Sequence, residues 1–260
     1  MALIDNIVSY WKQDEASGNA VDSHGGYTGV NTSATYVAGK IGNGSNSTGP
    51  TQYIEVSHEA GLYRTSGAHS ISMWWRHVDT VSQAIYSVSK MDFDAGAREG
   101  FGFQFINGSG LRFNVQKNGT VQSTGLYNTG WVADTWRHVV ATWDTAGLLA
   151  TMYVDGASVA TAVLTATTYT QNTLAFSFHS AFSTSRIGAG TGVGVDELGF
   201  WDRVLTAAEV TELYNGGAGL AYPFSSGPAN LKSYNTNLKA NIKSIDTNLI
   251  ANVKSFDTNV

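Results

Sequence analysis

Short runs in which apolar and polar residues alternate recur along the first 220 residues, and turn residues separate them. Between residues 69 and 78, for example, Ile71, Met73 and Trp75 are each separated by one residue. This period of two is typical of a β-strand, because successive side chains point to opposite faces of the sheet. Further strands are predicted at residues 6–11, 52–58, 135–144 and 195–205.

Two longer segments are predicted to form β-hairpins. In residues 100–116, Phe101, Phe103 and Phe105 share one face, and after the turn sequence NGSG the apolar side chains of 111–115 return on one face. In residues 148–164, the dipeptide Asp155-Gly156 is typical of a type I′ turn.

One short helix is predicted, at residues 206–217. Thr206 and Glu209 have the spacing of a capping box, and Gly216 is a typical terminator. Val210, Leu213 and Tyr214 would share one face of this helix. Many strands with a single helix predict an all-β domain, a two-sheet antiparallel sandwich.

Composition excludes several classes of function. Charged residues make up only 13% of the chain and the net charge is −5, which argues against a nucleic-acid partner. There is no cysteine, and no apolar run is long enough to insert into a membrane. The first residues do not have the pattern of a signal peptide. We therefore expect a protein that is cytoplasmic before assembly and that ends on a virion or another extracellular surface.

The composition changes near the end of the chain. Pro223 and Pro228 lie in a segment that precedes a region rich in Asn, Lys and Thr. This change predicts a domain at residues 1–220, a linker at 221–229 and a separate tail at 230–260.

The tail contains three near-copies of an eleven-residue phrase. Its apolar residues are spaced by three or four positions, which predicts a helix with one apolar stripe. Such a polar helix should persist only when several chains bury the stripe, so a parallel trimer or tetramer is expected. The alternative is a disordered polar tail. The predicted oligomerising stripe consists of Leu231, Tyr234, Leu238, Ile242, Ile245, Leu249, Val253, Phe256 and Val260.

Four motifs together suggest a family. They are "IVSYWKQDEASGNAVDSHGG", "SISMWWRH", "WRHVVATWD" with "MYVDG", and "VDELGFWDRVLTAAEVTELYNGG". In kind and order they resemble the concanavalin A-like lectin/glucanase superfamily, specifically the laminin G-like domains common in bacterial and phage proteins. The resemblance implies a jelly-roll sandwich that binds carbohydrates or protein surfaces.

The sequence predicts that the protein is not an enzyme. The glucanase branch carries an E-x-D-x-x-E strand motif, and this chain has none. An acidic group, Asp92, Asp94 and Glu99, falls in a predicted loop, where a solvated or cation-binding role is favoured over catalysis. The scattered His77, His138 and His179 are expected to make strand contacts rather than to bind a metal.

The resemblance also implies a structural Ca²⁺ ion between the early loop and the last strand. Asp22 and Asp196 stand at the family's positions, and carbonyl groups near Gly25 would complete the site. The alternative is that Asp22 forms an Asx turn and Asp196 caps a strand end.

A glycan site is predicted on one sheet face. If Trp74 is the core tryptophan of the family, alternation turns Trp75 outward, where it could stack on a sugar. Arg76 is expected to form a strand-end salt bridge. The alternative to a glycan site is a solvated face with Trp75 under a loop. The predicted ligand-binding residues are Trp75, Gln104, Arg112, Asn114 and Gln116.

These observations predict a non-enzymatic module that binds a glycan or a surface protein. A phage virion appendage or capsid-surface protein, oligomerised by the tail, is the expected setting. A purely structural cement or decoration domain that binds only protein is the alternative, followed by a glycosidase.

Overall fold

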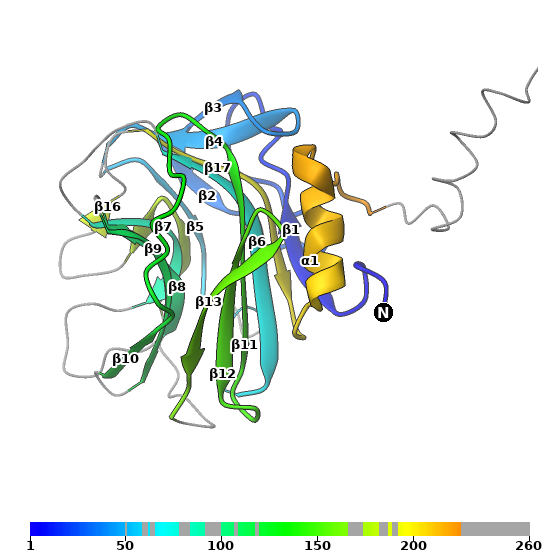
Figure 1. Ribbon diagram of the computed structural model, residues 1–260. Helices are drawn as coiled ribbons and strands as arrows, with labels where there is room; N and C mark the ends of the chain where they lie inside the picture. The colour runs from blue at the N-terminus through cyan, green and yellow to red at the C-terminus, as the bar shows by residue number, and fades with distance from the viewer. Residues whose placement is uncertain are drawn as a thin grey trace, which may run out of the picture. The chain divides into compact units, whose positions relative to one another are not determined.

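Two antiparallel sheets lie face to face in the computed structural model, with apolar side chains between them (Figure 1). One compact unit comprises Met1 and Leu3–Tyr222, and the residues from Pro223 belong to a second unit. The predicted tail at 230–260, like Asp92, Asp94 and Glu99, lies outside the described residues. The structure describes residues 1–49, 51–58, 62, 66–77, 84–91, 100–106, 109–117, 120–165, 174–181, 187–188 and 192–224.

The first sheet, sheet 1, combines strands from both ends of the unit with strands from its middle. Strand β1 (Ile7–Trp11) pairs with β17 at the side of the main path. The strands of that path are, in spatial order, β13 (Ala157–Val163), β12 (Leu149–Val154), β11 (Arg137–Asp144), β6 (Ala68–His77), β17 (Val193–Trp201), β4 (Asn43–Ser47) and β3 (Thr35–Ala38).

The second sheet, sheet 2, carries the predicted hairpin of residues 100–116. A small separate pair, β15 (Ser180–Ala181) and β16 (Ile187–Gly188), accompanies the two large sheets. The strands of sheet 2 are, in spatial order, β10 (Thr120–Ser123), β9 (Gly110–Lys117), β8 (Gly100–Ile106), β7 (Ala84–Met91), β14 (Phe176–Phe178), β5 (Tyr53–Val56) and β2 (Val30–Thr32).

Both predicted hairpins are confirmed. Phe103 of β8 lies opposite Phe113 of β9, and both side chains are buried in the core between the sheets. Strands β12 and β13 meet at Asp155 and Gly156, which have φ values of 49° and 81°. Two consecutive positive φ values define the type I′ turn that the Asp-Gly pair predicts.

The short helix is also confirmed, as α1 (Ala207–Tyr214), followed by a single 3₁₀ turn at Asn215–Gly217. Thr206 and Glu209 form the expected capping box, and Asn215 ends the helix in the left-handed conformation, at φ 48°. The helix lies on the side of sheet 1 that faces away from sheet 2 (Figure 1). No helix among the described residues is long and apolar enough to cross a membrane.

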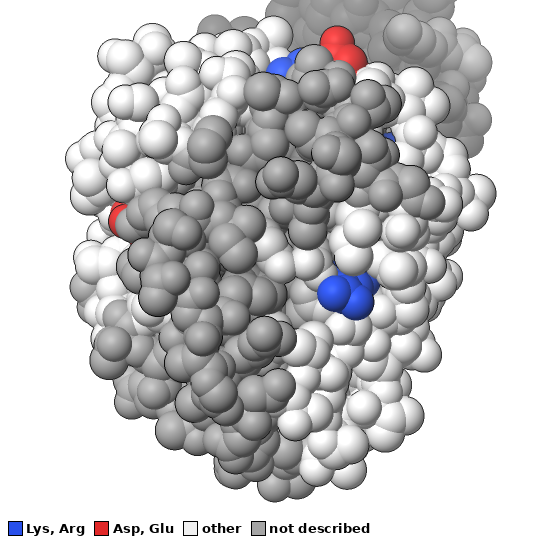
Figure 2. All heavy atoms as spheres, turned by 90° about the vertical axis from the view of Figure 1, so that its left-hand side faces the viewer, with Lys and Arg blue, Asp and Glu red and all other residues white. Residues whose placement is uncertain are grey.

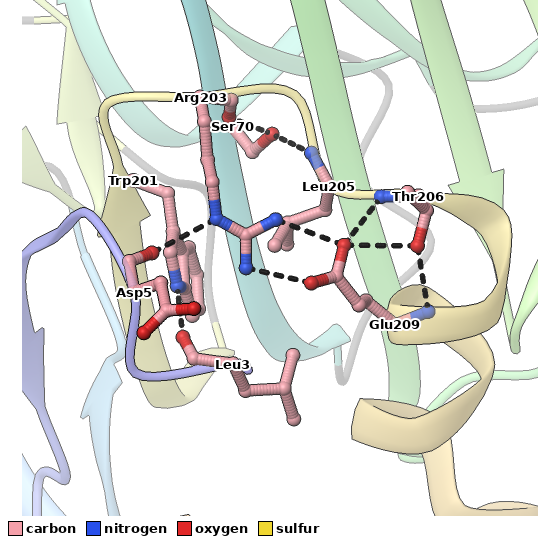
Figure 3. Close-up of polar contacts among 8 residues, drawn as sticks. All are labelled: Leu3, Asp5, Ser70, Trp201, Arg203, Leu205, Thr206 and Glu209. Atoms are coloured by element: carbon pink, nitrogen blue, oxygen red, sulfur yellow. Dashed lines mark hydrogen bonds and ion pairs between the residues drawn. The ribbon is translucent and has the colours of Figure 1, made fainter. Parts of the chain in front are cut away.

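A buried ion pair attaches the start of α1 to the N-terminal segment (Figure 3). Arg203 donates hydrogen bonds from Nη1 and Nη2 to the two carboxylate oxygens of Glu209, each at 2.8 Å. Its Nε donates to the carbonyl of Asp5, also at 2.8 Å. Although burial tends to raise the pKa of Glu209, the hydrogen bonds from Arg203 and Thr206 lower it overall. The pair therefore stays ionised while it joins three segments.

Removal of either charge from this pair should destabilise the protein strongly. We expect Glu209→Ala to lower the free energy of unfolding by about 3–5 kcal/mol, because Arg203 would remain buried without its partner. Glu212→Ala, on the exposed side of the same helix, is the matched control and should change stability by less than about 0.5 kcal/mol. Urea unfolding followed by tryptophan fluorescence measures both. Equal effects of the two substitutions would contradict this role of the pair.

Candidate functional site

The outer face of sheet 2 carries a row of polar side chains on β8 and β9. The phenylalanines of β8 face the core, so alternation directs Gln104 to the other side, where it lies opposite Arg112 of β9. Asn114 and Gln116 follow on the same face of β9. We call Gln104, Arg112, Asn114 and Gln116 the polar face, and its arrangement agrees with the alternation in the sequence.

Hydrogen bonds join most of the polar face into a network. Arg112 Nε donates to Gln104 Oε1 at 2.7 Å, and Gln104 Nε2 donates to the hydroxyl of Tyr86 on β7. Asn114 Nδ2 donates to Gln104 Oε1 at 3.4 Å, while Ser123 of β10 donates to Asn114 Oδ1 at 2.6 Å. The network spans four neighbouring strands and fixes the planes of its amide groups.

Exposure divides the polar face. Gln104, Asn114 and Gln116 are only 6%, 1% and 0% exposed, whereas Arg112 is half-buried and reaches the surface. Both polar atoms of the Gln116 side chain lack a hydrogen-bond partner. Figure 2 looks onto this side of the molecule, where charged atoms are few among the described residues. Of the predicted polar ligands, Arg112 is therefore the one that a ligand can reach directly in this structure.

The predicted outward orientation of Trp75 is wrong. Its side chain is fully buried between the sheets, with ring centroids 5.1 Å from Phe105 and 5.2 Å from Trp131. Trp74 points to the opposite face of β6, beneath Tyr214 of α1. The alternation is correct but its direction is reversed. Trp75 shares its side of β6 with Ile71 and Met73, so the alternation itself is consistent with a core position, and the error came from taking Trp74 as the core tryptophan of the family.

Asp22 organises the loop that follows β1. Its Oδ1 accepts hydrogen bonds from the backbone N–H groups of Tyr10, His24 and Gly25, all at 2.9 Å. Its Oδ2 accepts a fourth from Tyr27 at 3.0 Å. These contacts are those of the Asx-turn alternative, because four N–H donors already surround the carboxylate.

Asp196 and Glu197 form a buried acidic pair where β17 changes partners. On one edge β17 pairs with β4 at Val193–Val195 and with β1 from Leu198 onward. In the gap between the two pairings, Asp196 Oδ2 accepts the N–H groups of Lys40 and Ile41, at 2.7 and 2.9 Å. Glu197 Oε2 accepts the hydroxyl of Tyr10 at 2.6 Å. The pair thus attaches the β3–β4 turn and β1 to the last strand.

These contacts do not fit the calcium site that the resemblance implies. Asp22 and Asp196 each hold a different loop through N–H donors, and a cation would need those oxygens as ligands. Among the described residues, no three His, Cys, Asp or Glu side chains converge as a possible metal site. The calcium ion therefore stays a prediction, and the turn-forming role accounts for the contacts of both aspartates.

Two surface tryptophans were missed as candidate site residues. Trp131 and Trp136 lie in the segment between β10 and β11, each half-buried, and the guanidinium groups of Arg137 and Arg76 lie over their rings. Val132 between them is 62% exposed. The sequence GWVADTW, which contains both tryptophans within six residues, could have indicated this surface.

The structure contains the predicted salt bridge of Arg76 and polar contacts of two of the three histidines named above. Arg76 forms the expected salt bridge, with Asp134 at 2.9 Å. His138 and His179 each contact a serine hydroxyl through Nε2, at 2.9 Å from Ser72 and Ser45 respectively. Burial lowers the pKa of both histidines to about 3, so that both are neutral at pH 7. His138 lies on β11 as expected, whereas His179 lies between β14 and β15.

A β-sandwich with a fixed polar network on one sheet is the architecture of a lectin-like binding domain. The chain belongs to the concanavalin A-like lectin/glucanases superfamily, whose model matches residues 47–211, more than half of its length. The comparison with curated proteins finds no match.

Solved structures of toxin binding domains share the fold. The binding domain of Paraclostridial Mosquitocidal Protein 1 aligns with a TM-score of 0.64 and 16% identity, over 82% of this chain and 52% of that one. The binding domain of botulinum neurotoxin DC in complex with rat synaptotagmin II aligns with a TM-score of 0.63 and 14% identity, over 82% and 52% of the two chains. The same domain in complex with SialylT gives 0.59 and 13%, over 81% and 51%.

These similarities establish the fold, and the chain spans about half the length of each of these structures. The neighbours are binding domains by their titles, and at this level of identity the similarity to them concerns the fold alone.

The acidic pair should make stability depend on pH. Burial is the main reason why the pKa of Glu197 is raised from 4.5 to about 7. Because the folded-state pKa is raised, the stabilising contribution is present below pH 4.5 and is lost as the pH rises through 7. Glu197→Gln, which cannot ionise, should gain up to about 3 kcal/mol relative to wild type over this range.

Urea unfolding at several pH values between 4.5 and 8 measures this difference. Glu212→Gln on the exposed side of α1 is the control and should show no such trend, since it has no burial cost to remove. A constant difference between Glu197→Gln and wild type would contradict the burial effect.

Proposed function

We propose that this protein is a non-enzymatic module that binds carbohydrate on a biological surface through the polar face of sheet 2. The observation that supports this function most directly is the hydrogen-bonded network that ends at the half-buried Arg112. Planar amide and guanidinium groups that are held in place can bond sugar hydroxyls with little loss of side-chain entropy. The network is thus suited to oriented polar recognition rather than to hydrolysis.

The comparisons support a binding role in general terms. The related toxin domain is titled as a complex with SialylT in one structure and with rat synaptotagmin II in another. Carbohydrate and protein ligands therefore both occur among proteins of this fold. For this chain, carbohydrate is the proposal because the polar face combines amide groups with a cation.

A protein-binding role is the second candidate, and the segment between β10 and β11 favours it. Trp131, Val132 and Trp136 present apolar surface beside two arginines. Tryptophan and arginine are enriched at the energetic centres of protein interfaces. A cement or decoration protein would use such a surface to contact other subunits of its particle.

The proposed setting is a phage virion appendage or capsid-surface protein, in which the tails of several chains associate and hold their jelly-roll domains together. Individual carbohydrate sites are weak, and joining three or four of them raises the overall affinity through effective concentration. A structural Ca²⁺ ion at Asp22 and Asp196 is compatible with this proposal only if it replaces the backbone N–H donors that bond to the two carboxylates.

Carbohydrate binding should depend on the polar network. On an array of bacterial surface polysaccharides, we expect the intact protein to bind at least one class and Gln104→Ala to weaken that binding about tenfold, because Arg112 loses its orienting partner. Gln122→Ala is the matched control, since Gln122 points to the other side of its strand. If no polysaccharide binds at millimolar concentration, the carbohydrate function is wrong.

The tail should determine the oligomeric state. We expect sedimentation of the full chain to give a trimer or tetramer and a chain without residues 230–260 to give a monomer, because the apolar stripe is buried only between chains. A peptide from Asn230 to Val260 should show helicity that increases with concentration in circular dichroism. A monomeric full chain, with a coil spectrum of the peptide at every concentration, would contradict the proposal.

A further inference from the structure

The described arginines differ in how their charges are neutralised. Among the residues that the structure describes there are four, and three of them pair with a carboxylate. Arg76 pairs with Asp134, Arg137 with Asp155 and Arg203 with Glu209, at N–O distances of 2.8–2.9 Å. Arg112 is the exception: within the described part of the chain it has no acidic partner. Within that part of the chain its polar partner is a neutral amide, the side chain of Gln104.

The geometry of Arg112 leaves one side of its guanidinium group available. Nε donates to Gln104 Oε1 at 2.7 Å, and Gln104 is in turn held by Tyr86. The terminal nitrogens Nη1 and Nη2 form no hydrogen bond or ion pair with the described residues. Because the side chain is half-buried and fixed at Nε, this end of the group is a fork of N–H donors in a defined position.

In the described strands of sheet 2, no carboxylate lies close enough to neutralise Arg112. Glu55 of β5 is the only acidic residue in the described strands of sheet 2. It lies four strands away from β9, which corresponds to about 19 Å at the usual spacing between strands. Lys90 on β7 adds no negative charge and is itself buried. The site therefore combines one unpaired cation with neutral amide and hydroxyl groups.

We infer that Arg112 is the binding site for the carboxylate group of an acidic sugar. A carboxylate matches the two parallel N–H donors of the fork, and a bond between two charged groups is roughly twice as strong as one between neutral groups. A cation that is partly removed from water also gains more from an anion than from a hydroxyl. This inference rests on the proposed carbohydrate function and specifies its ligand class as uronic or sialic acids.

The groups next to Arg112 are neutral and polar, which suits a sugar better than an acidic protein segment. Along β9, Asn114 and Gln116 follow Arg112 on the same face, with about 6.8 Å between successive side chains. Both are buried, at 1% and 0% exposed, so they lie beneath the surface that Arg112 reaches. The amide of Gln116 is fully buried and without a partner, so it is the kind of group that a polar ligand or an ordered water would satisfy.

The test compares ligands that differ only in charge. The intact protein is titrated with trigalacturonic acid and with its methyl ester, and with 3′-sialyllactose and its methyl ester, by saturation-transfer NMR and calorimetry. We expect the acid of at least one pair to bind about tenfold or more tightly than its ester, and the difference to shrink as salt increases. An acidic hexapeptide of glutamate is titrated alongside.

Variants assign the effect to the guanidinium group. Arg112→Gln should reduce the acid to the affinity of its ester, and Arg112→Lys should recover only part of the difference because an ammonium group lacks the fork. Arg76→Gln, at a surface ion pair away from the polar face, is the control and should keep the preference. Thermal melts establish that the variants are folded, and the lysine variant provides the comparison if Arg112→Gln does not fold.

The outcomes separate this inference from the proposed function. If acids and esters bind equally, or if the preference survives in Arg112→Gln, the acidic-sugar inference is wrong while carbohydrate binding stands. If the glutamate peptide binds and none of these sugars does, the acidic-sugar inference is wrong and an acidic protein segment replaces the sugar as the ligand of Arg112. If neither class binds at millimolar concentration, the acidic-sugar inference is also wrong, and the polysaccharide array decides the carbohydrate function separately.

Discussion

The pairing of β17 with strands on both of its edges is the constraint on which the rest of the structure depends. On one edge it pairs with β6, and on the other it pairs first with β4 and then with β1. Every residue of β17 is buried, because sheet 2 covers one face and other segments of the chain cover the opposite face. A strand shared in this way must change partners in its middle, and an irregularity in the register lies at that point, after Asp196.

The partner change places two acidic side chains inside the protein. Asp196 and Glu197 sit where the regular ladder is interrupted, and their oxygens accept hydrogen bonds from the β3–β4 turn and from Tyr10. Their contacts replace ladder bonds that the interruption removes. The cost is that burial raises the pKa of Asp196 to about 8 and disfavours its ionised form. Asp22 plays the same hydrogen-bonding role in a more exposed loop, which explains why motif positions suited to calcium can be occupied by backbone donors instead.

Sheet 2 can present a polar face because most of the contacts that hold distant segments of the chain together lie on sheet 1. Strands β1 and β17 hold the two ends of the unit on sheet 1, and the ion pair of Arg203 and Glu209 fixes α1 there. The hairpin of β8 and β9 places Phe103 and Phe113 in the core. Its other face is polar and also largely buried, and there Arg112 reaches the surface from a hydrogen-bonded network. The fold therefore separates the surface that holds the chain together from the surface proposed to recognise a ligand.

Local patterns in the sequence were sufficient for much of the architecture. The period of two, the Asp155-Gly156 turn and the capping box of Thr206 and Glu209 depend on residues close in the chain, and the structure contains all three. Alternation likewise placed Gln104 and Arg112 on one face, since the hairpin register follows from the turn.

Only the tertiary structure decided which of these residues are accessible and which are paired. Both tryptophans of β6 are buried, Trp75 in the core between the sheets and Trp74 beneath Tyr214 of α1, although alternating apolar and polar residues are typical of a strand with one exposed face. The burial of Asn114, and the lack of an acidic partner for Arg112 among the described residues, depend on segments distant in the sequence. Local periodicity determines which way a side chain points relative to its neighbours, and only the packing of distant segments determines what it meets there.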